Sequence, residues 1–150
     1  MIINEKTAFQ DQGTLDDDLL CGVGQLVCAW GLLEQRLEQK IGILREAAGD
    51  VRTIGSRTRP GMAKLLAELR AMVSMRDRRN ATVLGEIAAL ERDIQRIDRF
   101  RSLIVSGFQG PEPQGFACRD HRNAHVHVSF DQLGAEIAQL GRIGERLLTL

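Results

Sequence analysis

The side chains of this chain that could act as acids, bases or metal ligands are concentrated in one short segment, residues 118–127. All three histidines of the sequence lie there, together with five other polar or reactive residues: Cys118, Arg119, Asp120, Arg122 and Asn123. Imidazole titrates near neutral pH, and thiol and imidazole groups are both ligands of transition metals. The segment therefore predicts either acid–base catalysis or a metal site.

The acid–base interpretation depends on Arg122, Asn123 and His127. A guanidinium binds and polarises a phosphate group, and a histidine transfers a proton at neutral pH. An arginine followed at short range by a histidine is therefore a candidate catalytic pair for a phosphate-bearing substrate. The run from Arg122 to His127, with His125 between them, would supply such a pair.

The alternative is a metal site formed by Cys118, His121, His125 and His127, which offer four ligands of the types that zinc prefers. On a strand, His125 and His127 project from one face, because side chains alternate with period two. Cys118 and His121 need a turn to join them. A metal-binding regulator built on these four residues is thus an alternative function.

Four stretches of the chain carry apolar residues at steps of three and four, which predicts helices at about residues 15–48, 61–75, 82–105 and 130–148. Thr14 and the aspartates that follow Leu15 are typical of a helix start, and Gly49 of a helix end. The apolar positions of the longest predicted helix are Leu19, Val23, Leu26, Trp30, Leu33, Leu37, Ile41 and Leu44.

An insertion at residues 107–128 separates the third and fourth predicted helices. Its first part is rich in glycine and proline, which exclude a helix. Farther on, apolar residues alternate with polar ones from Ala124 to Phe130, a pattern typical of a short strand. Ser129 and Gln132 then form a capping box at the start of the last helix. We expect a loop or a short β-hairpin before that helix.

These elements predict an all-α fold in one domain spanning residues 1–150. Four amphipathic helices with mostly short connections are typical of an antiparallel four-helix bundle, and the chain has the usual length of a single domain.

The chain resembles the HEPN superfamily in its helical frame and in one short motif. The motif is Arg122, Asn123, three further residues and His127. The frame, over residues 15–150, is a long first helix with Trp30 and Leu33-Glu34, a basic loop, two further helices and a terminal helix. The resemblance implies a small helical bundle that forms a homodimer, brings two motifs into one cleft and cleaves RNA without metal, often in toxin–antitoxin or antiphage systems.

A second placement of the motif is also open. In many HEPN-like proteins it closes a helix as Arg-Asn, three residues and His-Gly, and Arg101 to Gly107 matches that context. Ser106 then stands where the histidine is expected. A serine hydroxyl has no titratable proton near neutral pH, so this placement implies a catalytically degenerate relative.

The composition limits the kinds of partner that the chain is expected to bind. With 20 basic and 20 acidic residues the net charge is zero, so binding to nucleic acid requires a local patch. No apolar run is long enough for a signal peptide or a membrane span, which predicts a cytoplasmic protein without membrane contact.

Three functions remain open. They are an RNA-cleaving homodimer, a non-enzymatic helical module that binds a protein partner, and the metal-binding regulator.

Overall fold

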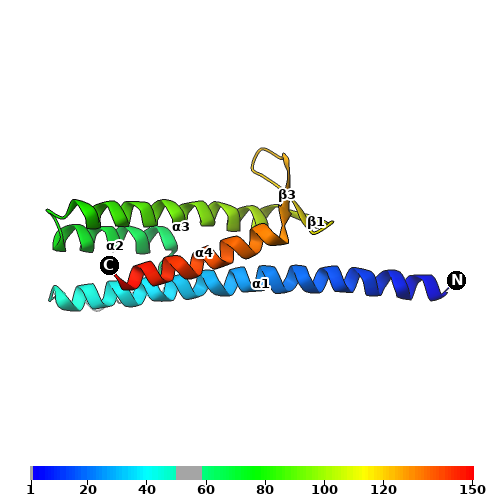
Figure 1. The fold of residues 1–150 in the computed structure, drawn as a ribbon, viewed down its shortest axis with the longest axis horizontal. Coiled ribbons are helices and arrows are strands. Elements are labelled where there is room, and N and C mark those ends of the chain that lie inside the picture. The colour runs from blue at the N-terminus through cyan, green and yellow to red at the C-terminus, as the bar shows by residue number, and fades with distance from the viewer. Residues whose placement is uncertain (1, 50–58) are drawn as a thin grey trace. The chain divides into compact units, whose positions relative to one another are not determined.

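The computed structural model describes residues 2–49 and 59–150, with side chains described at 17–49 and 59–150. Within these ranges the chain is mostly helical and also contains one small sheet (Figure 1). The elements are α1 (Ile2–Ala47), α2 (Met62–Arg76), α3 (Ala81–Gly107), β1 (Phe108–Glu112), β2 (Gly115–Arg119), β3 (His125–Ser129) and α4 (Phe130–Leu148).

Most of the helix bounds agree with the apolar pattern. The bounds of α2, α3 and α4 lie within two residues of those predicted. The predicted start of the first helix is wrong, because α1 begins at Ile2 and continues through Thr14. A capping residue favours a helix start without forcing one, and residues such as Glu5, Lys6 and Ala8 have good helix propensity. Most of the predicted basic loop at residues 50–61 lies outside the described residues.

The chain divides into two compact units. The first comprises Met1–Ala29 and Ile97–Gln139, and the second comprises Trp30–Arg96 and Leu140–Leu150. None of the helices in the described ranges has both the length and the apolar character needed to cross a membrane.

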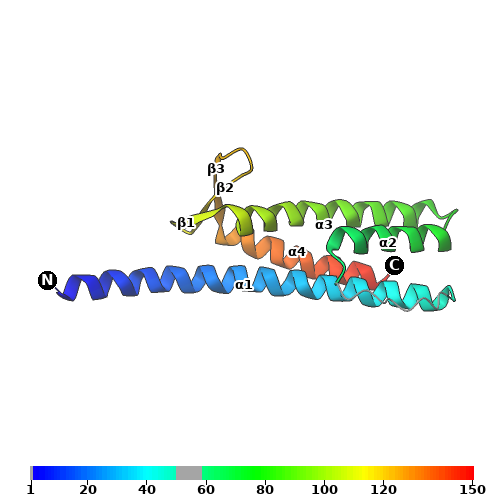
Figure 2. The same cartoon turned by 180° about the vertical axis from the view of Figure 1, so that it is seen from behind.

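The second unit is built on the apolar faces that the sequence predicts. In this unit α2 lies alongside the first part of α3 in both views (Figures 1 and 2). Two ion pairs flank the core. Arg45 pairs with Glu68 at a nitrogen-to-oxygen distance of 2.8 Å, and Arg146 pairs with Asp93 at 2.7 Å. Its fully buried side chains, which exclude water from the interior, include Leu33, Leu37, Leu65, Leu69, Leu90, Ile94, Ile143 and Leu147.

The first unit contains the sheet, which is the insertion predicted as a loop or hairpin. Figure 2 shows the three strands where α3 ends and α4 begins. The strand order is β1-β2-β3, with both pairs antiparallel. Phe116, Cys118 and Val128 are fully buried on one face of the sheet. The Phe116 ring lies between those of Phe108 and Phe130, with ring centroids 5.9 and 6.3 Å away.

The glycine- and proline-rich part of the insertion forms β1. Pro111 has no N–H to donate to a ladder, and proline is therefore tolerated mainly on edge strands. β1 is such a strand, because β2 alone pairs with it. The prediction from Ala124 to Phe130 is confirmed by β3, and the Ser129 hydroxyl accepts a hydrogen bond from the Gln132 N–H at 3.0 Å.

Two glycines permit the close backbone approaches that hold β2 in place. A Cβ at Gly115 would lie 2.0 Å from the Val128 carbonyl oxygen, and one at Gly107 would lie 2.0 Å from that of Arg119. No side chain fits at such a distance without moving the backbone of the neighbouring strand. Glycine is therefore required at positions 107 and 115, where the neighbouring backbone leaves no room for a side chain.

Substituting Gly115→Ala is expected to destabilise the fold by about 2 kcal/mol or more, since the new methyl group displaces β3. Urea denaturation followed by circular dichroism measures this loss. Gly110→Ala is the matched control on β1, because a Cβ there meets no atom within 4 Å. Equal stability of the two variants would contradict the steric interpretation.

Candidate functional site

The sheet brings one carboxylate and two imidazoles together on its exposed face. Glu112 Oε2 lies 3.0 Å from His125 Nε2, and Glu112 Oε1 lies 3.0 Å from His127 Nδ1. Glu112 comes from β1 and both histidines come from β3. We call these three residues the histidine–glutamate cluster.

Strand register explains why these side chains meet. His127 pairs with Ala117, which pairs with Gly110, and Glu112 pairs with Gly115. Side chains alternate along each strand, so all of these residues belong to one face. Gly115 and Ala117 are the β2 residues between Glu112 and β3, and their small size leaves room for the Glu112 side chain to reach both histidines.

The cluster stabilises the ionised form of its carboxyl group. The hydrogen bond from His127 is the largest cause that holds the pKa of Glu112 below its ordinary value of 4.5, and His125 adds to the effect. Both histidine side chains are exposed. Each ring contacts Glu112 through one nitrogen, Nε2 in His125 and Nδ1 in His127. A carboxylate on one ring nitrogen orients the imidazole.

Arg119 provides a guanidinium on the same face. It pairs with His125 across β2 and β3, and its Nη1 donates a hydrogen bond to the Asn123 carbonyl oxygen at 2.9 Å. This bond holds the guanidinium end of the side chain against the loop at the end of the hairpin. Arg119 thus adds a positive charge at the loop end of the face that carries His125 and His127.

Arg122 and Asn123 lie in the loop that joins β2 to β3. The Asp120 carboxylate accepts hydrogen bonds from the N–H groups of Arg122 and Ala124, both at 2.9 Å. Asn123 has a φ of 63°, a left-handed conformation that asparagine tolerates. Arg122 is exposed in this loop, whereas His127 lies within β3, two residues beyond the strand's first residue. The predicted pair therefore comes from different parts of the hairpin, and His127 has Glu112 as its nearest charged contact.

The alternative pair, Arg101 and Ser106, lies on α3. Arg101 is partly buried and pairs with Asp98 at 2.9 Å, whereas Ser106 is exposed next to the end of the helix. Residues five apart on a helix point in directions about 140° apart. The two side chains therefore project from different sides of α3.

Of the four residues of the predicted metal site, His125 and His127 share the exposed face of the sheet, and Cys118 and His121 lie elsewhere. Cys118 is fully buried on the face of the sheet opposite His125 and His127, and burial raises the pKa of its thiol, with the Glu112 charge as a second cause. His121 lies in the exposed hairpin loop. No group of three or more histidine, cysteine or acidic residues within the described ranges is arranged to hold a metal ion.

Sequence reasoning missed Glu112 and gave Arg119 no role. The sequence signal that could have identified Glu112 is Pro113-Gln114, which forms a turn between two short strands. This turn pairs Glu112 with Gly115. Once that turn is assigned, strand alternation places Glu112 on the face of the histidines.

Comparison of the chain with protein-family models, curated proteins and solved structures finds no match in any of the three.

The folding stability is expected to depend on pH through Glu112. Because its pKa is lowered in the folded chain, the ionised carboxylate stabilises the fold above pH 4.5, and this contribution is lost as the pH falls through the folded-state pKa. The Glu112→Gln variant should therefore be less stable than the original chain at about pH 6, with the difference shrinking toward about pH 3.

Urea midpoints at both pH values measure this change. Glu145→Gln is the control, since it removes an exposed carboxylate of α4. A stability difference for Glu112→Gln that is the same at both pH values would contradict the role of the ionised carboxylate.

Proposed function

We propose that this chain is a HEPN-like helical protein that cleaves RNA without a metal ion, using the histidine–glutamate cluster. The observation that carries the proposal is the pair of exposed imidazoles, each 3.0 Å from the same Glu112 carboxylate. Two positioned imidazoles on an open surface supply what phosphodiester cleavage needs, a base and an acid that both work near neutral pH.

The reaction is an internal transesterification of RNA. His127 takes the proton of a ribose 2′-hydroxyl, the 2′-oxygen bonds to phosphorus, and the bond from phosphorus to the 5′-oxygen breaks. Protonated His125 gives its proton to the departing 5′-oxygen. Successive residues on one face of a strand are roughly 6.6 Å apart, which allows the two rings to flank one phosphate group.

The remaining groups have supporting roles. The Glu112 carboxylate orients both rings and stabilises the imidazolium that forms on His127. A guanidinium stabilises the charge that develops on the phosphate, and Arg119 on the same face is the nearest candidate in register. Arg122, exposed in the adjoining loop, is the second guanidinium in reach of a bound strand.

The resemblance to HEPN proteins completes the proposal. It assigns α1 to α4 to an antiparallel bundle that forms a homodimer, as in toxin–antitoxin and antiphage ribonucleases. In this chain Ser106 occupies the histidine position of the helix-closing motif. The proposal therefore places the catalytic histidine on β3 instead of at the end of α3.

Removing His127 is expected to slow RNA cleavage by about 10²-fold or more, which is the usual contribution of a general acid–base group. The measurement is cleavage of a labelled RNA by the purified chain in the presence of a chelator, comparing the original sequence with His127→Ala and Glu112→Gln. We expect a smaller loss, about tenfold, for Glu112→Gln, because the Glu112 carboxylate orients the imidazole ring but does not itself transfer the proton.

His121→Ala is the matched control, since this third histidine lies in the hairpin loop. Full activity of His121→Ala with loss in His127→Ala supports the cluster. RNA that stays intact with the original chain, or cleavage that continues unchanged in His127→Ala, would sink the ribonuclease proposal.

A second candidate function is a non-enzymatic helical module that pairs with another copy of the chain. The observation in its favour is the exposed face of α1 in the first unit. Leu20 and Val27 are 68% and 54% exposed, and a Cβ at Gly24 between them would meet no atom within 4 Å. A glycine between two exposed apolar residues allows the backbone of another helix to approach closely.

If this face mediates self-association, the double variant Leu20→Glu, Val27→Glu shifts the chain from dimer to monomer, because the added carboxylates repel across the interface. Light scattering at matched concentrations measures the change. Ile43→Glu is the control, since Ile43 is 62% exposed elsewhere on α1. A chain that is monomeric before any substitution would rule out this module.

A further inference from the structure

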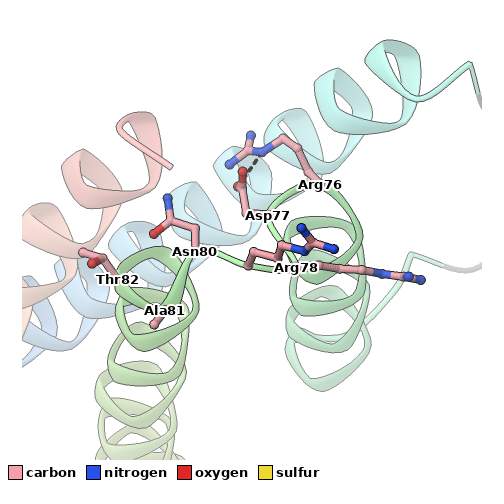
Figure 3. Close-up of a pocket in the computed structure, with 7 residues that line it drawn as sticks. Arg76, Asp77, Arg78, Asn80, Ala81 and Thr82 are labelled. Atoms are coloured by element: carbon pink, nitrogen blue, oxygen red, sulfur yellow. Dashed lines mark hydrogen bonds and ion pairs between the residues drawn. The ribbon is translucent and has the colours of Figure 1, made fainter.

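The turn between α2 and α3 gathers three arginines around a hollow at the surface of the second unit. The hollow has a volume of about 800 Å³. Figure 3 shows Arg76 and Asp77 joined by a hydrogen bond, and Asn80 and Thr82 at the start of α3. The lining residues form one continuous run: Arg76, Asp77, Arg78, Arg79, Asn80, Ala81 and Thr82.

Backbone hydrogen bonds hold this turn without help from the arginine side chains. The Asp77 N–H donates to the Val73 carbonyl oxygen at 2.9 Å, and the Asn80 N–H donates to the Asp77 carbonyl oxygen at 3.0 Å. The Asn80 side chain caps α3 by accepting the Val83 N–H at 3.3 Å. The turn is therefore a formed structure that these backbone bonds and the Asn80 cap hold in place.

The charges at the turn do not balance. Arg76 is anchored, by Asp77 at 2.7 Å and by the Leu150 carbonyl oxygen at 2.9 Å. Arg78 and Arg79 are exposed, and neither forms an ion pair with another residue in the part of the chain that the structure describes. In a chain of zero net charge, this is a local positive surplus.

We propose that this turn, with Arg78 and Arg79 as its principal contacts, binds the phosphodiester backbone of a single-stranded nucleic acid. Guanidinium groups bind phosphate through paired N–H donors. The lining contains no aromatic ring on which a base could stack, so it suits a backbone contact better than a free nucleotide. This site lies in the second unit and acts in binding, so it stands independently of cleavage by the histidine–glutamate cluster.

The test is binding of a fluorescent single-stranded oligodeoxynucleotide, which lacks the 2′-hydroxyl that cleavage requires. The double variant Arg78→Ala, Arg79→Ala should weaken binding on the order of tenfold at low salt, regardless of base sequence. It should also reduce the slope of log affinity against log salt concentration by about 1.4, since each lost phosphate contact in a single strand removes about 0.7. The control is Arg92→Ala, Arg99→Ala, which removes two exposed arginines of α3.

Loss of affinity and of salt slope in the turn variant, with both kept in the α3 control, supports the site. The proposal is overturned by absence of binding to the original chain, or by equal losses in both double variants, which would show that only total charge matters. Binding that a free nucleoside monophosphate abolishes at stoichiometric concentration would also overturn it, since the ligand would then be the nucleotide. RNA cleavage is measured separately, so failure of either proposal can be told from failure of the other.

Discussion

Backbone contact between β2 and its neighbours is the constraint on which the candidate site depends. Gly115 lies against the Val128 carbonyl and Gly107 against the Arg119 carbonyl, at distances that exclude any side chain. These contacts hold β2 in one register, and that register places Glu112 and the two histidines on the same face. A shift of a strand by one residue would turn the histidines toward the core and Val126 and Val128 toward solvent. The geometry of the cluster therefore depends on glycine at positions 107 and 115.

The two faces of the sheet differ in charge. The buried face packs Phe116 and Cys118 without charge, whereas the exposed face holds a carboxylate whose ionised form is stabilised by two imidazoles. The carboxylate also helps to keep Cys118 protonated behind it, because its charge raises the pKa of the thiol. Cys118 therefore contributes to packing as a small apolar residue, and the two imidazoles and their carboxylate lie on the other face.

Sequence reasoning predicted the helical part of this fold well and the site incompletely. Periodicity alone identified the buried positions of the helices, such as Leu26, Leu37 and Ile94, since spacing along a helix determines its buried face. It missed β1 because a proline-containing edge strand has no apolar alternation. Glu112 is 13 and 15 residues from its two partners, so their contact depends on two turns and a register that no local pattern encodes. The pairing of Arg122 with His127 relied on their spacing in sequence, and the structure places Arg122 in the loop and His127 in β3.

Burial gives each unit its own spectroscopic or chemical reporter. Trp30, the single tryptophan, is buried in the second unit, so its fluorescence follows the opening of that unit's core. Cys118 is buried in the first unit behind the sheet, whereas Cys21 and Cys28 are exposed. A thiol reagent therefore modifies two cysteines in the folded chain and reaches the third only when the sheet separates from its core. The rate at which Cys118 is modified therefore measures how often the sheet that carries the histidines separates from its core.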